Sequence, residues 1–121
     1  MIKINAPIKP LPFKRVMTNG KRRYNSAEYT EFKTELGYFA LRAMSGREPL
    51  KGEILLRAEF YKKRPKNPAS RNWGDLDNHV KAVMDSLNGI CFLDDRQVVE
   101  IHATKQYGEP HIEIELEETN K

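Results

Sequence analysis

The sequence predicts an α/β fold, in which a single small domain of residues 1–121 has a mixed sheet of about four strands packed against two main helices. Three observations indicate this fold. The chain has 121 residues, a length that suits one domain burying roughly two-thirds of its unfolded surface. Several segments alternate apolar and polar residues as strands do, and two repeat apolar residues every three or four positions as helices do. A parallel pair of strands is possible where a helix connects them.

The N-terminal half predicts a strand, a loop and a helix. Alternation over residues 2–6 predicts a short strand, which the following prolines end. Residues 7–25 have little periodicity and predict a loop with a turn at Asn19–Gly20. Apolar residues then recur at helical spacing over residues 27–44, and the Ser26 hydroxyl is suited to cap that helix.

The second half predicts a strand, a long loop, a helix and two further strands. Residues 52–61 alternate, and the proline-containing basic segment 62–73 breaks the pattern. An apolar stripe predicts a helix over residues 77–87, which ends at an Asn-Gly pair. Residues 99–107 and 112–117 alternate on either side of a short connection, so we expect these two strands to form a hairpin.

Basic residues gather in two segments that contain no acidic residue, although the net charge is only +4. One segment ends at Ala27, and the other precedes the second predicted helix. Such segregation would attract a polyanion to one region, whereas the alternative interpretation is that the basic loops only keep the surface hydrated. The candidates for contact with a DNA backbone are Lys14, Arg15, Arg22, Arg23, Lys62, Lys63, Arg64 and Arg71.

The remaining composition excludes some classes of protein. The single cysteine, Cys91, cannot form an intrachain disulfide, and we expect it to be a small buried hydrophobic residue. No stretch has the pattern of a signal peptide or a membrane span. We therefore expect a soluble intracellular protein of the cytoplasm that has no membrane partner.

Two pairs of aspartates flank the second predicted helix. Asp75 and Asp77 stand at its start, Asp94 and Asp95 follow its end, and Lys81 lies one turn after Asp77 on the same face. Two carboxylates about 4 Å apart repel by roughly 4 kcal/mol at an effective dielectric of about 20, so a close pair calls for a proton or a cation. Mg²⁺ is the natural partner, because it binds through a few carboxylates together with phosphate oxygens.

A purely structural interpretation of these residues stays open. Asp77 could cap the helix, and Lys81 could pair with Asp77 and Asp85 in ordinary surface ion pairs, which are common and weak. The neighbouring basic loop favours a metal site, because a cationic loop beside an acidic pocket suits a phosphate backbone. For His79, on the same helix, we expect a solvated side chain without a functional role.

Two blocks of residues in register also carry a resemblance. The first contains Asp-Leu-Asp-Asn, a lysine four residues after the second aspartate, and Asp-Ser-Leu; the second is Leu-Asp-Asp-x-Gln-Val-Val. Together they form GDLDNHVKAVMDSLNGICFLDDRQVVE, Gly74 to Glu100, which resembles the core of the RusA family of Holliday junction resolvases. The chain differs from the family at Gly74, where we expect arginine, and in the length of the preceding basic loop.

The resemblance implies a function. Members of this family are homodimeric, Mg²⁺-dependent endonucleases of bacteria and phages that resolve four-way DNA junctions by paired nicks in recombination and repair; Mn²⁺ is a possible substitute, and no small-molecule cofactor is implied. By resemblance, Asp75, Asp77 and Asp95 are the metal-binding acids, and these three with Lys81 are the catalytic residues. The resemblance alone favours Asp95 over Asp94.

Two other functions are compatible with the sequence. One is a non-catalytic protein that binds branched or single-stranded nucleic acid, in which the acids only cap and pair. The other is a nuclease of the same fold that acts on flaps or other branched DNA.

Overall fold

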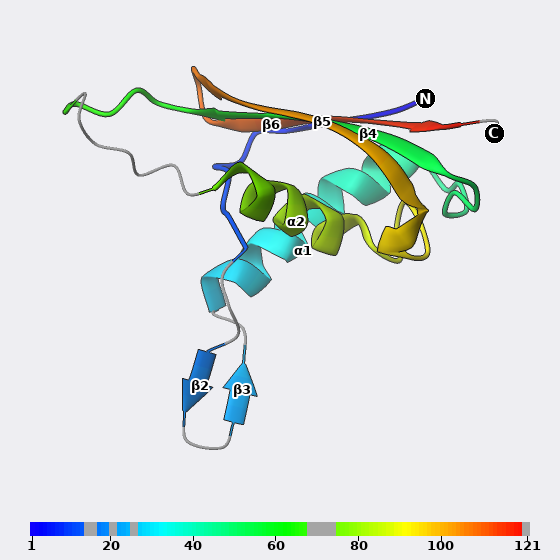
Figure 1. Cartoon of the computed structure of the whole chain (residues 1–121), viewed down its shortest axis with the longest axis horizontal. Coiled ribbons are helices and arrows are strands. Elements are labelled where there is room, and N and C mark those ends of the chain that lie inside the picture. Colours follow the sequence, from blue (N-terminus) through cyan, green and yellow to red (C-terminus); the bar gives the residue numbers. More distant parts are fainter. Residues whose placement is uncertain (14–16, 20–21, 25–26, 68–74, 120–121) are drawn as a thin grey trace.

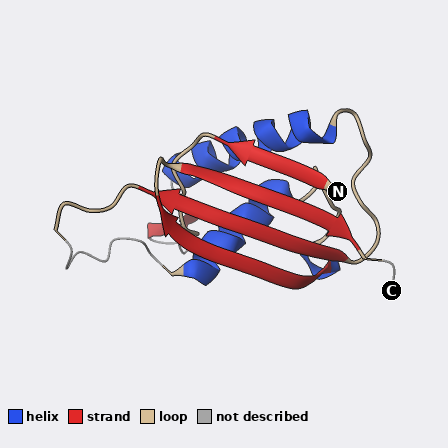
Figure 2. Cartoon of the chain, turned by 90° about the horizontal axis from the view of Figure 1, so that it is seen from above, coloured by secondary structure: helices blue, strands red, loops and turns tan. Residues whose placement is uncertain are grey.

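The computed structural model describes residues 1–13, 17–19, 22–24, 27–67 and 75–119. A four-stranded sheet forms one layer, and the two α-helices form the second layer on one face of it (Figure 1). Seen from above, after a turn of 90°, the strands lie in front of the helices (Figure 2). The expected small α/β fold is thereby confirmed.

The sheet is mixed, as predicted. It consists of β1 (Ile2–Ala6), β4 (Ile54–Lys62), β5 (Val98–Tyr107) and β6 (His111–Glu118), in the order β1-β6-β4-β5. β4 and β5 are parallel and are joined through the helix α2 (Leu76–Leu87), whereas β6 is antiparallel to both of its neighbours. The possible parallel pair therefore exists, at the place where a helix connects two strands.

The expected hairpin of the last two strands is wrong, because β4 lies between β5 and β6. The core-facing side chains of β4, from Ile54 to Phe60, are at most 1% exposed, whereas Ile101 of β5 is 45% exposed. The two strands with the most buried faces, β4 and β6, take the interior positions, and β5 forms an edge. The connection of residues 108–110 must therefore cross one intervening strand, a distance of about 10 Å. At roughly 3.3 Å per residue, this short segment is long enough.

The segment expected to be a loop contains two short strands. β2 (Met17–Asn19) and β3 (Arg22–Tyr24) pair antiparallel, with Met17 opposite Tyr24. In Figure 1 this pair projects away from the sheet and the helices. Three-residue strands are too short to leave a readable alternation, which explains why the sequence predicted only a loop. The expected turn at Asn19–Gly20 lies partly outside the described residues, because Gly20 is not among them. The expected cap residue Ser26 lies wholly outside them.

The two helices bury the apolar faces that their periodicity predicted. α1 (Ala27–Met44) has the expected bounds, and α2 begins at Leu76, one residue earlier than expected. Beyond α2, Gly89 has φ 84°, a left-handed conformation that glycine adopts without strain. Cys91 is fully buried, and burial raises the pKa of its thiol to about 11, so it is the expected small hydrophobic residue. Within the described residues, no helix has the length and apolarity needed to cross a membrane.

Candidate active site

The start of α2 places Asp75 and Asp77 in different positions. Asp75 is the N-cap residue with an extended backbone (φ −77°, ψ 141°), whereas Asp77 already lies in the first turn. The Asp75 carbonyl accepts hydrogen bonds from the backbone N–H groups of Asn78 at 3.1 Å and His79 at 3.2 Å. Its carboxylate makes no capping hydrogen bond. The alternative in which Asp77 caps the helix is therefore wrong.

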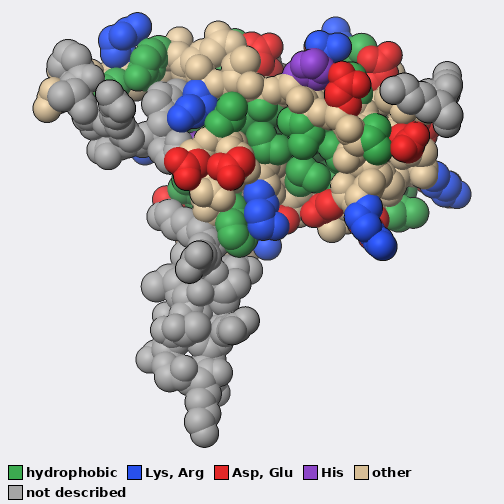
Figure 3. Space-filling view, in the orientation of Figure 1, with side chains coloured by type: hydrophobic (Ala, Val, Ile, Leu, Met, Phe, Trp, Pro, Cys, Tyr) green, Lys and Arg blue, Asp and Glu red, His purple; other side chains and the backbone are tan. Residues whose placement is uncertain are grey.

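A groove between α2 and β5 brings three of the four expected catalytic residues together. Asp77, Lys81 and Asp95 line this groove, which has a volume of about 740 Å³, and Asp75 does not line it. Figure 3 shows hydrophobic side chains gathered in the middle of one face of the molecule, with acidic and basic side chains at their border. The apolar residues that line the groove are Leu76, Val80, Met84, Ile101 and Ala103.

The carboxyl group of Asp95 has one oxygen that is buried without a hydrogen-bond partner among the described residues. Asp95 begins the short 3-10 helix η1 (Asp95–Gln97), and this oxygen is its Oδ1. Burial raises the pKa of this carboxyl, and the negative charge of Asp85 adds to the effect, while Lys81 opposes it. A carboxylate in such surroundings is stabilised by a cation.

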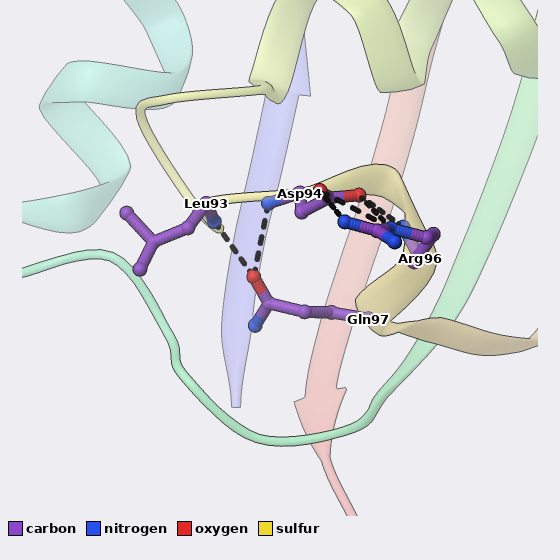
Figure 4. A network of polar contacts seen from close by, with 4 residues as sticks. All are labelled: Leu93, Asp94, Arg96 and Gln97. Carbon is purple, nitrogen blue, oxygen red and sulfur yellow. Dashed lines mark hydrogen bonds and ion pairs between the residues drawn. The ribbon is translucent and has the colours of Figure 1, made fainter.

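The neighbouring Asp94 has a structural role that Asp95 lacks. Its side chain accepts hydrogen bonds from the backbone N–H of Arg96 at 2.8 Å and from the Arg96 guanidinium at 3.0 Å (Figure 4). These contacts with Arg96 hold the pKa of the Asp94 carboxyl below its usual value. Asp94 caps η1, and this gives a physical reason for the choice of Asp95, which rested on resemblance alone.

Gln97 fastens the turn that carries these acids, and the sequence analysis did not single it out. Its Oε1 accepts hydrogen bonds from the backbone N–H groups of Leu93 at 2.8 Å and Asp94 at 3.0 Å (Figure 4). Its Nε2 donates to the carbonyls of Leu50 at 2.8 Å and Gly52 at 3.0 Å, just before β4. The spacing of Asp94 and Gln97 is that of a capping box, a signal that could have revealed this role.

Lys81 pairs with the second acid of its helix face. Its Nζ lies 3.5 Å from Oδ1 of Asp85, as the i+4 spacing predicted, and 4.7 Å from the centre of the Phe13 ring. The side chain is half-exposed, so the ion pair itself contributes little to stability. Its effect is to confine the ammonium group beside the groove.

His79 contradicts the expectation of a solvated side chain. It is fully buried, and its ring packs edge-on against Phe60 at 5.2 Å between ring centres. Burial lowers the pKa of His79, against an opposing hydrogen bond from its Nδ1 to the Asp75 carbonyl at 2.9 Å. His79 therefore stabilises the start of α2 as a neutral core residue. A polar residue at the edge of an apolar stripe carries no sequence signal of such burial.

The structure places only part of the expected DNA-binding surface. Lys62 is half-buried at the end of β4, and its pKa is lowered by burial and then by Lys9 and Lys105. Lys63 and Arg64 are exposed, and the Arg64 guanidinium lies 4.5 Å from the centre of the Tyr107 ring. Arg22 and Arg23 lie in β3, and Lys14, Arg15 and Arg71 lie outside the described residues.

The donors in the groove suit a magnesium ion. Within the described ranges, no three His, Cys, Asp or Glu side chains come close enough together to hold a metal. Mg²⁺ commonly keeps several waters and binds through one or two carboxylates together with substrate phosphates. Asp77 and Asp95, which line one groove, meet that requirement, and the unpartnered oxygen of Asp95 is a fitting ligand atom.

Comparison with known proteins decides the family. Residues 7–117 match the family described as Endodeoxyribonuclease RusA. The chain belongs to the RusA family. The match covers nearly the whole chain, so the resemblance carried by the two acidic blocks extends to the strands and helices around them.

A relative of this RusA family chain is the uncharacterized protein YqaN of Bacillus subtilis (strain 168). The two sequences are 43% identical over 47 residues, which is 38% of this chain and 33% of the relative. The chain thus matches about a third of the length of this curated relative.

The RusA family motif has a clear structural counterpart. Its first block forms α2, and its second block forms η1 and the start of β5. The groove lies where these two blocks meet, since it is lined from α2 by Asp77 and Lys81 and from η1 by Asp95.

Proposed function

We propose that the protein is a Mg²⁺-dependent endodeoxyribonuclease that resolves four-way DNA junctions by paired nicks. One observation carries this proposal: Asp77, Lys81 and Asp95 line the same groove, and one Asp95 oxygen is buried without a partner. Membership of the RusA family supports the reaction class. Residues 1–121 act as a single domain, with a role in recombination and repair.

Each acidic or basic group of the groove has a role in phosphodiester hydrolysis. Asp77 and Asp95 would hold Mg²⁺, or Mn²⁺ in its place; Asp75, a third metal-binding acid by family resemblance, is the N-cap residue and does not line the groove. When bound there, the ion would supply an activated water and would offset negative charge in the transition state. The Lys81 ammonium faces the charge that develops on the phosphate in the transition state. The half-exposed position of Lys81 beside the groove leaves it accessible to a DNA backbone.

The partners follow from the same chemistry. We propose that a homodimer places two such sites on opposite strands of a junction in the bacterial cytoplasm. Contacts with phosphates give affinity without choice of sequence. The groups that make them are the basic residues of the N-terminal segment and of the end of β4 and its following loop: Lys14, Arg15, Arg22, Arg23, Lys62, Lys63, Arg64 and Arg71.

Adjacent aspartates provide a matched test of the proposal. Asp95→Asn should retain junction binding and lose nicking by at least about a hundredfold, the scale expected when stabilisation of the transition-state charge is lost with the ion. Asp94→Asn should keep nicking within a few-fold, since asparagine also caps helices well. The measurement is cleavage of a four-way junction with Mg²⁺, compared with a flap and a linear duplex at one salt concentration.

Three outcomes would count against the proposal. Nicking at the wild-type rate by Asp95→Asn would remove Asp95 from the site. Undiminished activity in excess EDTA would exclude metal dependence. Strong, salt-dependent binding with no nicking would instead identify a non-catalytic nucleic-acid-binding protein.

A further inference from the structure

The first helix contributes a buried hydroxyl to the surroundings of the groove. Tyr29, in the first turns of α1, is 2% exposed, and its hydroxyl donates a hydrogen bond to Oδ2 of Asp85 at 2.7 Å. The two residues are 56 positions apart in the chain. A hydrogen bond to an ionised carboxylate is among the stronger kinds, and here it fixes the orientation of an acid on α2 from a different helix.

The second oxygen of the same carboxylate faces Lys81. Asp85 Oδ1 lies 3.5 Å from Lys81 Nζ, and the side chain of Asp85 is 23% exposed against 48% for Lys81. The acid is thus the more enclosed member of the pair. Because its other oxygen is held by the Tyr29 hydroxyl, the direction in which Oδ1 points toward Lys81 is set by α1.

An aromatic ring also borders the Lys81 ammonium. The Lys81 ammonium lies 4.7 Å from the centre of the Phe13 ring, and that ring packs edge-on against Tyr29 with 5.6 Å between centres. The Phe13 backbone N–H donates to the carbonyl of Asn78 at 2.8 Å, so the ring is anchored on α2. Tyr29 therefore contacts both groups that border the ammonium, Asp85 through its hydroxyl and Phe13 through its ring.

We propose that Tyr29 is a positioning residue for Lys81 in the nuclease reaction. Its hydroxyl orients the Asp85 carboxylate, and this carboxylate holds the lysine ammonium beside the groove. A lysine side chain has four rotatable bonds, so an ammonium without a fixed partner samples many positions away from the reacting phosphate. This role rests on the function proposed above, in which Lys81 acts on the phosphate.

Two tyrosines of one helix allow a matched test. Tyr29→Phe removes only the hydroxyl and keeps the ring, while Tyr38→Phe removes an exposed hydroxyl from the same helix. We expect Tyr29→Phe to lower kcat for junction cleavage by about five- to tenfold, the scale of the net contribution of one ordinary hydrogen bond. The dissociation constants for junction DNA and for Mn²⁺ should change less than about twofold, the scale expected for groups that Tyr29 does not touch. Tyr38→Phe should match the wild type throughout.

A second measurement does not depend on nuclease activity. The ¹⁵Nζ order parameter of Lys81 from nuclear magnetic resonance, assigned through Lys81→Arg, reports how firmly the ammonium is held. It should fall in Tyr29→Phe and in Asp85→Asn and stay unchanged in Tyr38→Phe. If the wild-type protein fails to nick any DNA, the proposed function is overturned, whereas this measurement still decides whether Tyr29 holds Lys81.

Three results would overturn the positioning role of Tyr29. An unchanged kcat and an unchanged order parameter in Tyr29→Phe would show that its hydroxyl does not act on Lys81. A tenfold or greater loss of Mn²⁺ affinity in Asp85→Asn would assign Asp85 to the metal instead. A fall in cleavage that follows only the loss of folded protein, measured by circular dichroism of the same samples, would reduce Tyr29 to a structural residue.

Discussion

The side chain of Gln97 donates a hydrogen bond to the backbone carbonyl of Leu50 at 2.8 Å, across 47 residues of sequence. With its further bonds to Gly52, Leu93 and Asp94, this amide joins the turn that presents Asp95 to the chain entering β4. The position of a candidate metal-binding acid therefore depends on a neutral side chain two residues away.

Replacing Gln97 should loosen this turn. Gln97→Met keeps the approximate length of the side chain and removes all four hydrogen bonds, so we expect a loss of about 2–4 kcal/mol in the free energy of unfolding. Urea denaturation checks the stability, and Mn²⁺ titration should show weaker binding because Asp95 is no longer held in place. Gln106→Met, on the exposed face of β5, should cost less than about 1 kcal/mol. Equal losses for the two variants would contradict the role of Gln97.

Metal binding should reverse the stability order of the wild type and Asp95→Asn. Without metal, the neutral amide removes a partly buried negative charge that is repelled by Asp85, so the variant should be at least as stable as the wild type. Saturating Mn²⁺ should stabilise only the wild type, by about 2.7 kcal/mol at a hundred times its Kd. Thermal unfolding with and without Mn²⁺ measures both effects. An Asp95→Asn protein that Mn²⁺ stabilises as strongly as the wild type would contradict this prediction.

The exposed basic residues beyond β4 should contribute a salt-dependent part of DNA affinity. Lys63→Ala and Arg64→Ala should each reduce the slope of log K against log salt concentration by about 0.9, because each removes one phosphate contact. Fluorescence anisotropy over a salt series measures this slope. Lys51→Ala is the control, since Lys51 is also exposed and pairs with Glu48 at 3.9 Å. An identical slope for all three variants would place the DNA elsewhere.

One pH dependence should arise on the open face of the sheet. His111 Nε2 lies 2.9 Å from Glu113, and this hydrogen bond raises the pKa of His111 above its usual value. A raised folded-state pKa gives stability that is fully present below the unfolded value of about 6.5 and is lost as pH rises through the folded value. The contribution should stay below about 1 kcal/mol for a pair near the surface.

Glu113→Gln should abolish the part of the pH dependence that comes from this pair, that is, the loss in the free energy of unfolding between about pH 5.5 and about pH 8. Urea denaturation at the two pH values measures it. The ring of His111 also stacks on Tyr61 at 4.1 Å between centres, and the variant leaves that contact in place. A pH dependence that survives in Glu113→Gln would have to come from other groups.

Local patterns predicted the elements well, because they depend on neighbours in sequence. The helix of residues 27–44 has the expected bounds, and the i+4 spacing of Lys81 and Asp85 gave their ion pair. The same spacing on α2 put Asp77 and Lys81 on one groove. The location of Asp75 relative to these residues was less predictable, because it depends on where the helix begins.

Relations between distant segments could not be read from the sequence. Alternation shows which side chains of β5 and β6 face the core, but it does not show that β4 separates these strands. The bond from Tyr29 to Asp85 and the burial of His79 likewise result from how the helices pack on each other and on the sheet. Each of these features is a tertiary contact that carries no periodic signal.

The order of strands also has a consequence for synthesis on the ribosome. Among the described strands, β1 pairs with β6 alone, with Ile2 opposite Leu116, so β1 must wait for its partner until β6 has been synthesised. At roughly 5–20 residues per second, this wait lasts on the order of 6–20 seconds. Because β6 also pairs with β4, the sheet that supports the groove is completed only after β6 has been synthesised. A nascent chain that has not reached β6 therefore lacks the complete sheet that supports the groove.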